Sequence, residues 1–553
     1  MNIVALKALF FAGGATFLAF LMARIAFSDV VGRQRMDNWF ILYGLITLSI
    51  FLISNFWIFL LVLFVLTLIF GSREPVMPAI FALLVLSVPA KGAWLSGFGV
   101  VQNLLYVVPS DIVQIAVVVL ALIRFSEPNN TRMGGGIADK CFILFAIVAM
   151  MLSFRDTTFT NGLRICVVFI LSSMPAYFIF SRMRWTEETI KVTTIALMVP
   201  LIALSGVAVL EVLTSWHFYS AAIANWGIPY RGIYILREGF LRAYGTLLGP
   251  IAFGAILMVG LALAPAVIQS MNNKFLGRLG FLGLGGGILA ALSRAPWIGT
   301  GIVFVLHALT DKKAASSLGR LALIGVACLA VLAVTPFGSS VINTIPGLGD
   351  DSHDETISYR QELLRVGVNV VRDNPFFGST EYLERDDLEE LRQGQGVIDL
   401  VNTYLHVAMN YGLVGLTLFL AVKFLAFFSI WRSIARARIV LPELAPYCQA
   451  YFAALGGLLF VLFTTTNTIG QFEQVIWMIV GTSIGLTRVV NEAWVKAGGK
   501  APVLAPQTAV EDTPVEEKEI KGAGVASPAL ARQPVLDPSN LPPHLRQYAK
   551  RTD

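Results

Sequence analysis

Apolar runs recur along almost the whole chain, and this feature restricts the possible folds more than any other. Among 553 residues, 56% are hydrophobic and only 14% are charged. Soluble domains carry about 25% charged residues, so this chain has too little charge to cover a soluble surface. A helix that crosses a membrane needs about 20 mostly apolar residues, and runs of nearly this length return throughout the sequence. The pattern predicts an all-α polytopic membrane protein.

The apolar runs predict about 14–15 transmembrane helices. We expect these spans at 3–23, 39–53, 54–71, 77–90, 108–123, 140–153, 163–181, 189–213, 245–264, 279–292, 295–309, 318–336, 403–430, 446–466 and 472–490. The stretch 39–71 fits either one long tilted helix or a tight hairpin. The first run lacks the small-residue cleavage site of a signal peptide, and we interpret it as a retained span.

Two segments are too polar to lie in a membrane. Residues 337–402 contain "GDDSHDET" and "ERDDLEELRQ", and residues 495–553 contain "EDTPVEEKEIK". The second segment has too little apolar surface to bury, which predicts a disordered tail. The expected organisation is transmembrane helices at 1–336, an extracytoplasmic loop with short helices at 337–402, C-terminal transmembrane helices at 403–494, and a cytoplasmic tail at 495–553.

Positive residues predict the orientation, because Lys and Arg concentrate in cytoplasmic loops. The loop "WRSIARARIVLPELAP" carries Arg432, Arg436 and Arg438 and is expected inside. Alternation from this loop puts 337–402 outside and the tail inside. The same rule accounts for the net charge of +6 without a nucleic-acid partner. The four cysteines lie in apolar segments without metal-ligand spacing, so neither a metal site nor a disulfide framework is expected.

Several arginines fall on the predicted outer face, where the charge rule does not expect them. They are Arg231, Arg237, Arg242, Arg294, Arg360, Arg365 and Arg372. Ionisable groups at membrane depth are costly and mark functional sites, although surface arginines also reach towards lipid phosphates. An arginine fork binds phosphate oxygens through paired hydrogen bonds. Because the chain lacks a nucleotide-binding glycine motif, the cluster predicts a site for a diphosphate with a lipid tail.

Four stretches carry these arginines and the end of the loop. They read "LRAYGTLLGPIAFG" at 241–254, "LSRAPWIG" at 292–299, "SYRQELLRVGVNVVRDNPFFGS" at 358–379 and "VNTYLHVAMNYGLVGL" at 401–416. In this order they resemble two arginine motifs, the loop signature and the membrane re-entry segment of the O-antigen polymerase and ligase superfamily. The resemblance covers residues 240–420.

The resemblance implies a metal-independent, inverting glycosyltransferase that needs no cofactor. Its implied donor is an oligosaccharide on undecaprenyl diphosphate, at the outer face of a bacterial inner membrane. Arg242 and Arg294 match the diphosphate-binding arginines of the family, and Arg360 matches the arginine that opens the loop helix. Preorganised cations of this kind stabilise the negative charge that develops on a leaving diphosphate. Lys91 in "VPAKGAWL" falls on the same face and is a further candidate for this site.

One departure from the family concerns the general base. O-antigen ligases place a histidine directly before the asparagine or serine of the re-entry segment, but this chain has Val401 before Asn402. The difference favours the polymerase branch and leaves the base open. His406, about one helical turn later, is the first candidate, with a buried structural histidine as the alternative. Glu238 and Asp399 are rival carboxylates on the same face.

The loop and its surroundings offer candidate sugar contacts. We expect Asn402, Tyr404 and Arg365 to contact the acceptor or the glycan. Aromatic residues on the same face suit either stacking on sugars or anchoring at the membrane interface, and they are Trp226, Tyr230, Tyr244 and Trp297. The loop helix has an apolar side that we expect on the membrane surface. Pro375 ends this helix, and Gly378 permits the following turn.

The best interpretation is a polymerase that joins oligosaccharide repeat units into exopolysaccharide, capsule or O-antigen. Its expected partners are the lipid-linked oligosaccharide, membrane lipid, and the chain-length regulator and flippase of the same pathway. An O-antigen or glycan ligase that transfers to a lipid or protein is the alternative within the enzyme class. A flippase is the alternative from another class. A flippase needs charged residues in a cavity that is accessible from both faces of the membrane. In this chain the unexpected arginines all lie on one predicted face.

Overall fold

The structure is a computed structural model, and it describes most of the chain. The described residues are 3–97, 103–124, 135–229, 236–237, 239–334, 354–392, 398, 400–466 and 470–499. They belong to the first of two compact units, Met1–Pro506. The second unit, Gln507–Asp553, lies outside the described residues.

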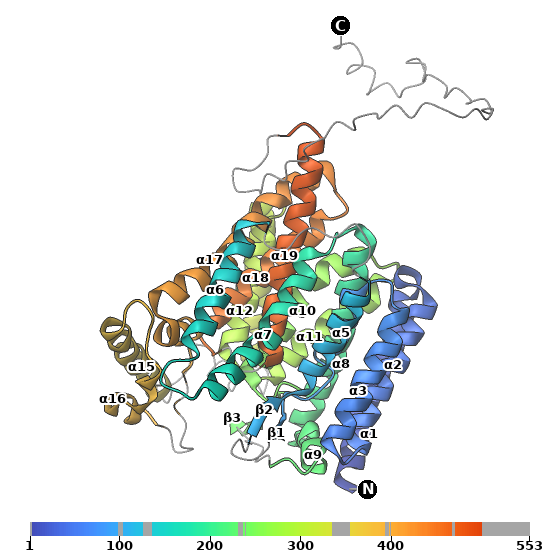
Figure 1. The fold of residues 1–553 in the computed structure, drawn as a ribbon. Coiled ribbons are helices and arrows are strands. Elements are labelled where there is room, and N and C mark those ends of the chain that lie inside the picture. The colour runs from blue at the N-terminus through green and yellow to red at the C-terminus, as the bar shows by residue number, and fades with distance from the viewer. Residues whose placement is uncertain are drawn as a thin grey trace, which may run out of the picture. The chain divides into compact units, whose positions relative to one another are not determined.

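The described part of the first unit consists of helices joined by turns, with two small β-hairpins (Figure 1). The first helices are α1 (Ile3–Val31), α2 (Arg33–Leu52), α3 (Phe56–Arg73), α4 (Met77–Leu84), α5 (Pro109–Arg124), α6 (Ile137–Leu152), α7 (Phe159–Arg182), α8 (Glu187–Thr214) and α9 (Phe218–Asn225). The later helices are α10 (Pro250–Gln269), α11 (Lys274–Ala290), α12 (Arg294–Leu309), α13 (Ala314–Val334), α15 (Asp354–Asp373), the 3-10 helix η2 (Glu381–Glu384), α16 (Asp386–Glu389), α17 (Thr403–Val440), α18 (Ala445–Leu462) and α19 (Gly470–Lys496). The antiparallel hairpins are β1 (Ala93–Ser96) with β2 (Asn103–Val107), and β3 (Leu236–Arg237) with β4 (Phe240–Leu241).

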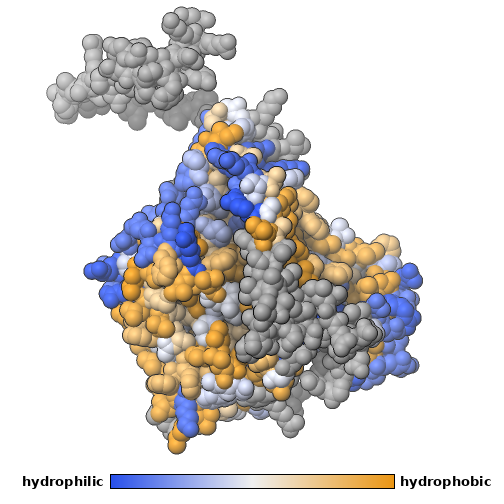
Figure 2. Space-filling view, turned by 180° about the vertical axis from the view of Figure 1, so that it is seen from behind, coloured by the Kyte–Doolittle hydropathy of each residue, from blue (hydrophilic) through white to orange (hydrophobic). Residues whose placement is uncertain are grey.

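Seven described helices are long and apolar enough to cross a membrane, namely α1, α3, α7, α8, α10, α17 and α18. Large apolar side chains on several of them are exposed, for example Phe10 on α1 and Leu61 on α3. Figure 2 shows apolar residues over much of the visible face, with hydrophilic residues gathered towards its margins. This exposed apolar area suits lipid and not water. The predicted all-α polytopic membrane fold is confirmed.

The stretch 39–71 forms a hairpin and not one long helix. α2 ends at Leu52 and α3 begins at Phe56. Asn55 caps α3, because its Oδ1 accepts the N–H of Trp57 at 2.9 Å and of Ile58 at 3.1 Å. A side-chain cap of this kind satisfies N–H groups that have no partner inside the helix, and it fixes the position of the turn.

The run 77–90 departs from the expected span. Its helix, α4, ends at Leu84, and the chain continues without helical structure to Ala90. Almost every residue from Met77 to Val88 is buried among other helices. The apolar run therefore marks a segment enclosed by protein on all sides, which composition alone does not distinguish from a lipid-facing span.

The elements outside the long helices gather at one end. Figure 1 places α9, β1, β2, β3, α15 and α16 there, and we call it the loop end. Phe11 near the start of α1 stacks on Phe218 of α9, with ring centroids 5.2 Å apart. The opposite end, which we call the basic end, holds the buried ion pair of Arg182 with Asp139 at 2.7 Å. Which end faces the cytoplasm stays a prediction from the charges.

Close packing in the centre fixes where α12 begins. Gly287 of α11 lies against Ser205 of α8, and a Cβ at this glycine would overlap that serine. Gly299 of α12 lies equally close to Met258 of α10. Small residues let membrane helices approach in this way. The contacts hold α11 and α12 against the central helices α8 and α10, so the turn between them is fixed at the loop end.

Candidate functional site

Three arginines lie around the turn between α11 and α12. Arg237, at the end of β3, donates from Nη1 to the carbonyl oxygen of Leu292 over 2.8 Å. Arg242, which follows β4, donates from Nη2 to the hydroxyl of Ser293 over 2.7 Å. Arg294 is the first residue of α12. We call Arg237, Arg242 and Arg294 the arginine site.

The turn that receives these contacts is strained. Leu292 has a φ of 46°, a left-handed conformation that costs free energy for any residue except glycine. Ser293 occupies the N-cap position, but its hydroxyl donates to the carbonyl of Ala291 at 3.1 Å and caps no helix N–H. The first N–H groups of α12 therefore keep their positive potential, which favours an anion beside Arg294.

Arg242 has an unusual environment for a cation. Its pKa is lowered to about 10, first by burial and then by the neighbouring positive charge of Arg237. The group is still protonated at neutral pH. Keeping two cations close together away from water is unfavourable, and a bound anion would offset this cost. The arrangement is therefore typical of a site for phosphate oxygens.

A buried carboxylate holds the segment that carries Arg242. Glu211, near the end of α8, has no exposed surface, and its Oε2 accepts the N–H groups of Tyr244 and Gly245, both at 3.2 Å. The same oxygen lies 3.3 Å from Nδ1 of His217, whose ring stacks on Tyr244 at a centroid distance of 3.6 Å. Glu211 is a candidate functional residue that was not predicted, although a lone acid late in an apolar span is a signal of function.

Lys91 lies beside this segment, and its contact with a diphosphate stays a prediction. The N–H of Ala90 donates to the carbonyl of Thr246 at 2.8 Å, and the Thr246 hydroxyl donates to the carbonyl of Leu86 at 2.9 Å. These bonds join the stretch before Lys91 to the segment that holds Arg242. The Lys91 side chain itself lines a groove with aromatic walls.

The loop arginines lie on α15, which packs against α17. Arg360 is partly buried, one turn before the buried Leu363. Arg365 is exposed, and its Nε donates to Oε2 of Glu362 at 2.9 Å. Arg372 is exposed as well. The expected contact of Arg360 with a diphosphate stays a prediction. The expected contact of Arg365 with a glycan stays one as well.

The re-entry segment begins α17. Asn402 caps this helix, because its Oδ1 accepts the N–H of Tyr404 at 2.9 Å and of Leu405 at 3.1 Å. The Tyr404 hydroxyl donates to the carbonyl of Leu459 in α18 at 2.7 Å. Both side chains thus fix the helix in its place. His406 lies one turn after the cap, half-buried, and its ring makes no hydrogen bond or ion pair among the described residues.

Four residues named from the sequence lie outside the described residues, namely Tyr230, Arg231, Glu238 and Asp399. The two rival carboxylates for the general base therefore stay predictions. Within the part of the chain that the structure describes, no three His, Cys, Asp or Glu side chains are grouped to hold a metal ion.

Residues 279–420 match the family model described as O-antigen ligase. We call residues 279–420 the O-antigen ligase domain, after the family model that they match. The match supports the O-antigen ligase and polymerase superfamily, and with it a glycosyl-transferring membrane enzyme of the ligase or polymerase type. No curated protein matches the chain. The O-antigen ligase domain includes Arg294 and the whole segment from α15 to the start of α17, whereas Arg237 and Arg242 precede it.

The O-antigen ligase domain contains a break in α17 that receives the loop signature. Gly412 has a φ of 66° and interrupts the helix. The N–H of Leu413 then donates to the carbonyl of Pro375 at 2.8 Å, and the N–H of Ser379 donates to the carbonyl of Met409 at 2.8 Å. Gly378 has a φ of 68°, and a Cβ there would overlap the backbone at Met409. The glycines of the two motifs therefore let two backbones meet.

An arginine outside the O-antigen ligase domain locks this junction. Arg155, between α6 and α7, donates from Nη1 to the carbonyls of Phe377 and Gly378, both at 2.9 Å, and from Nη2 to the carbonyl of Asn410 at 2.7 Å. The neighbouring Asp156 accepts from the Thr380 hydroxyl at 2.7 Å. No side-chain pattern in the sequence marks Arg155, because its acceptors are main-chain groups and three of them lie more than 200 residues away.

Part of the apolar side of α15 packs against protein, whereas Leu364 and Val368 stay exposed, and their contact with a membrane surface stays a prediction. Leu363, Val366 and Val370 are buried together with Leu388 of α16 and Leu405 of α17. A helical pattern predicts that one face is apolar, but not which partner covers that face. The O-antigen ligase domain thus includes a small second core beside the membrane helices.

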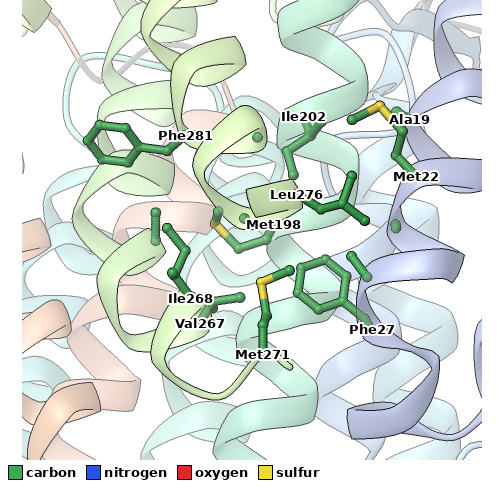
Figure 3. Close-up of a pocket in the computed structure, with 15 residues that line it drawn as sticks. Ala19, Met22, Phe27, Met198, Ile202, Val267, Ile268, Met271, Leu276 and Phe281 are labelled. Atoms are coloured by element: carbon green, nitrogen blue, oxygen red, sulfur yellow. The ribbon is translucent and has the colours of Figure 1, made fainter. Parts of the chain in front are cut away.

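A small apolar cavity lies away from the arginine site. Figure 3 shows Met198, Ile268 and Met271 among its lining, between α1, α8, α10 and α11. Its volume is about 30 Å³. A cavity of this size holds one water at most, and one without polar lining stays dry. It is no site for a sugar or a diphosphate.

Proposed function

We propose that the chain polymerises oligosaccharide repeat units carried on undecaprenyl diphosphate at the outer face of a bacterial inner membrane. The observation that carries the proposal is the arginine site, where Arg237 and Arg242 contact the turn that precedes Arg294. Three cations beside a helix N-terminus suit a diphosphate. Their position beside apolar helices suits a donor whose tail stays in the lipid.

The proposed reaction is an inverting displacement. A hydroxyl oxygen of the acceptor sugar attacks the anomeric carbon of the donor sugar from the side opposite to the diphosphate. The bond from this carbon to the diphosphate oxygen breaks, and the electron pair leaves with undecaprenyl diphosphate. Arg242 and Arg294 stabilise the developing negative charge, a role that arginines of the chain can fill without a metal ion. His406 is the first candidate to take the hydroxyl proton, and Arg360 of the loop helix is the candidate for a further positive charge at the diphosphate.

A ligase that transfers the glycan to a lipid or protein acceptor is the second candidate. The family description favours it. The residue before Asn402 favours the polymerase, because Val401 is apolar and packs at the edge of the small core beside α15. The side chain therefore offers no group that can accept a proton.

The test is polymer formation by the purified protein in nanodiscs, with the lipid-linked repeat unit as the only substrate. Replacement of Arg294 by alanine is expected to lower the rate about 10²–10³-fold, because a preorganised donor to the leaving group is lost. Lysine is expected to restore only part of the rate, since a point charge lacks the planar fork. The matched control is Arg278→Ala. Arg278 is exposed near the start of α11, far along this helix from the turn that leads to Arg294.

The products distinguish the candidates. A polymerase converts the donor alone into a ladder of longer glycans on lipid, whereas a ligase releases undecaprenyl diphosphate only after an acceptor is added. A flippase moves the donor between leaflets without breaking any bond. Wild-type turnover by correctly folded Arg294→Ala would show that this arginine only anchors lipid headgroups, and the proposed site would be wrong.

A further inference from the structure

A groove at the loop end has no role in the reaction described above. It lies between the α2–α3 turn, the β1–β2 hairpin and the end of α9, and its volume is about 690 Å³. This volume falls within the range of about 300–1,000 Å³ that is usual for small-molecule sites. We call it the aromatic groove, because its walls carry Trp57, Trp94, Tyr106 and Trp226.

The aromatic walls are held in place. Trp94 of β1 is paired with Tyr106 of β2, and their rings lie edge to face at 5.2 Å. The Tyr106 hydroxyl accepts the N–H of Gly92 at 3.0 Å. From α7, Arg164 donates to the carbonyl of Leu104 at 3.0 Å and lies 5.4 Å from the Trp94 ring. The hairpin is therefore a rigid platform, although Trp94 itself remains 47% exposed.

The other side of the groove is equally fixed. Trp57 follows the Asn55 cap in the first turn of α3 and is 40% exposed. Trp226 is buried and stacks on Phe59 at 4.8 Å. A tryptophan that only anchors a helix at a membrane interface faces lipid. Trp57 and Trp94 instead border one cavity from two separate elements, which an anchoring role does not require.

The chemistry of the lining suits a sugar. The C–H groups of a pyranose ring pack well on the electron-rich face of an aromatic ring. Asn55 and Lys91 add polar groups that can hydrogen-bond to hydroxyls, and the described lining contains no acidic side chain. A neutral or anionic oligosaccharide fits this combination. A lipid tail would gain little from the polar groups.

The groove borders a stretch that is hydrogen-bonded to the segment carrying Arg242. Lys91 follows Ala90, whose N–H donates to the carbonyl of Thr246 at 2.8 Å. Thr246 lies four residues after Arg242 on the same well-packed segment. One hydrogen bond therefore joins the stretch that precedes Lys91 of the groove to the segment that carries Arg242.

We propose that the aromatic groove binds an oligosaccharide, namely the part of the substrate glycan beyond the reacting sugar. The proposal rests on the proposed function for the identity of that glycan. The binding itself is independent of the diphosphate. Free glycan fragments should therefore bind without any lipid.

The probe is a set of fragments of two to four repeat units, released by partial acid hydrolysis from the polysaccharide of the host strain. Their binding to the full-length protein in nanodiscs is measured by surface plasmon resonance. Trp94→Ala is expected to weaken binding about tenfold, which corresponds to the loss of one aromatic stacking partner. Trp94→Phe keeps an aromatic face and should retain most of the affinity, which excludes a folding defect as the cause.

Two controls make the outcome decisive. Trp431 is a 51% exposed tryptophan in the half of α17 towards the basic end, so Trp431→Ala should bind fragments like the wild type. Arg294→Ala should bind them too, because they carry no diphosphate. Unchanged affinity of Trp94→Ala, or no fragment binding by the wild type at millimolar concentration, would overturn the groove proposal and leave the arginine site untouched.

A third result distinguishes between a sugar and a lipid headgroup as the occupant of the groove. If the sensor signal follows the content of phosphatidylglycerol in the nanodisc and not the fragment concentration, the groove holds lipid headgroups and the proposal is wrong. Conversely, fragment binding that Trp94→Ala weakens would stand even if Arg294→Ala were fully active. Failure of the groove and failure of the proposed reaction are thus distinguishable.

Discussion

Arg155 and Arg242 are both partly buried arginines at the loop end, and their surroundings differ in one respect. Four main-chain carbonyls accept hydrogen bonds from the Arg155 guanidinium, and three of these bonds join the loop signature to the break in α17. Arg242 has one good hydrogen bond, to Ser293, and a weak one to the Ala291 carbonyl at 3.5 Å. Among the described residues, the charge that acts on its pKa is that of another cation, Arg237.

The difference shows how a structural arginine and a ligand-binding arginine are recognised. A guanidinium whose donors all point at carbonyls has no capacity left for a ligand, and its charge strengthens each of those bonds. A guanidinium with unused capacity beside a like charge is poorly satisfied by the protein alone. Position at the loop end, which the two share, decides nothing.

The largest expected effect on stability comes from Arg155→Ala. Hydrogen bonds from a charged donor are worth roughly 1.5–3 kcal/mol each, and partial exposure lowers the sum, so we expect a loss of about 3–5 kcal/mol. Thermal unfolding in detergent would measure it, with Arg33→Ala as the control, because Arg33 is exposed at the start of α2. Activity should fall only in proportion to the unfolded fraction. Lost activity without a lower melting temperature would show that Arg155 contacts substrate. The distinction between a structural Arg155 and a ligand-binding Arg242 would then be wrong.

Arg242→Ala should give the opposite pattern. We expect the rate to fall about 10²–10³-fold, because a cation at the leaving group is removed. The melting temperature should change little, since only one strong hydrogen bond is lost and the repulsion from Arg237 disappears with it. Inorganic pyrophosphate should inhibit the wild type and have a weaker effect on the variant. Equal inhibition of both proteins would place the diphosphate elsewhere.

The sequence predicted the membrane helices because their apolar runs are long and regular. It also predicted that Arg242 and Arg294 belong to one site, since both lie in motifs of one superfamily. It did not reveal Arg155, because the partners of this arginine are main-chain groups brought close only by the fold. A carbonyl or an N–H is present at nearly every residue, so no side-chain pattern marks it. For the same reason, the sequence could not predict which residues pack against the apolar side of α15.

The smallest of these effects concerns Glu211, a carboxylate that holds the segment carrying Arg242. Its carboxylate accepts the N–H groups of Tyr244 and Gly245, two and three residues after Arg242. Glu211→Gln keeps one oxygen as an acceptor, so we expect a folded protein whose Arg242 is less well positioned. The rate should fall about tenfold, because a small displacement of a preorganised group already costs much of its effect.

A double-mutant cycle separates this positioning role from a merely structural one. If Glu211 acts through Arg242, then Glu211→Gln should lower the rate about tenfold in the wild type and hardly at all in Arg242→Ala, because residues that act as a unit are not additive. A structural role would lower both rates by the same factor. The melting temperature of each protein, measured alongside, shows whether all four are folded. Equal factors in the two backgrounds would remove Glu211 from the site and leave Arg242 positioned by the α11–α12 turn alone.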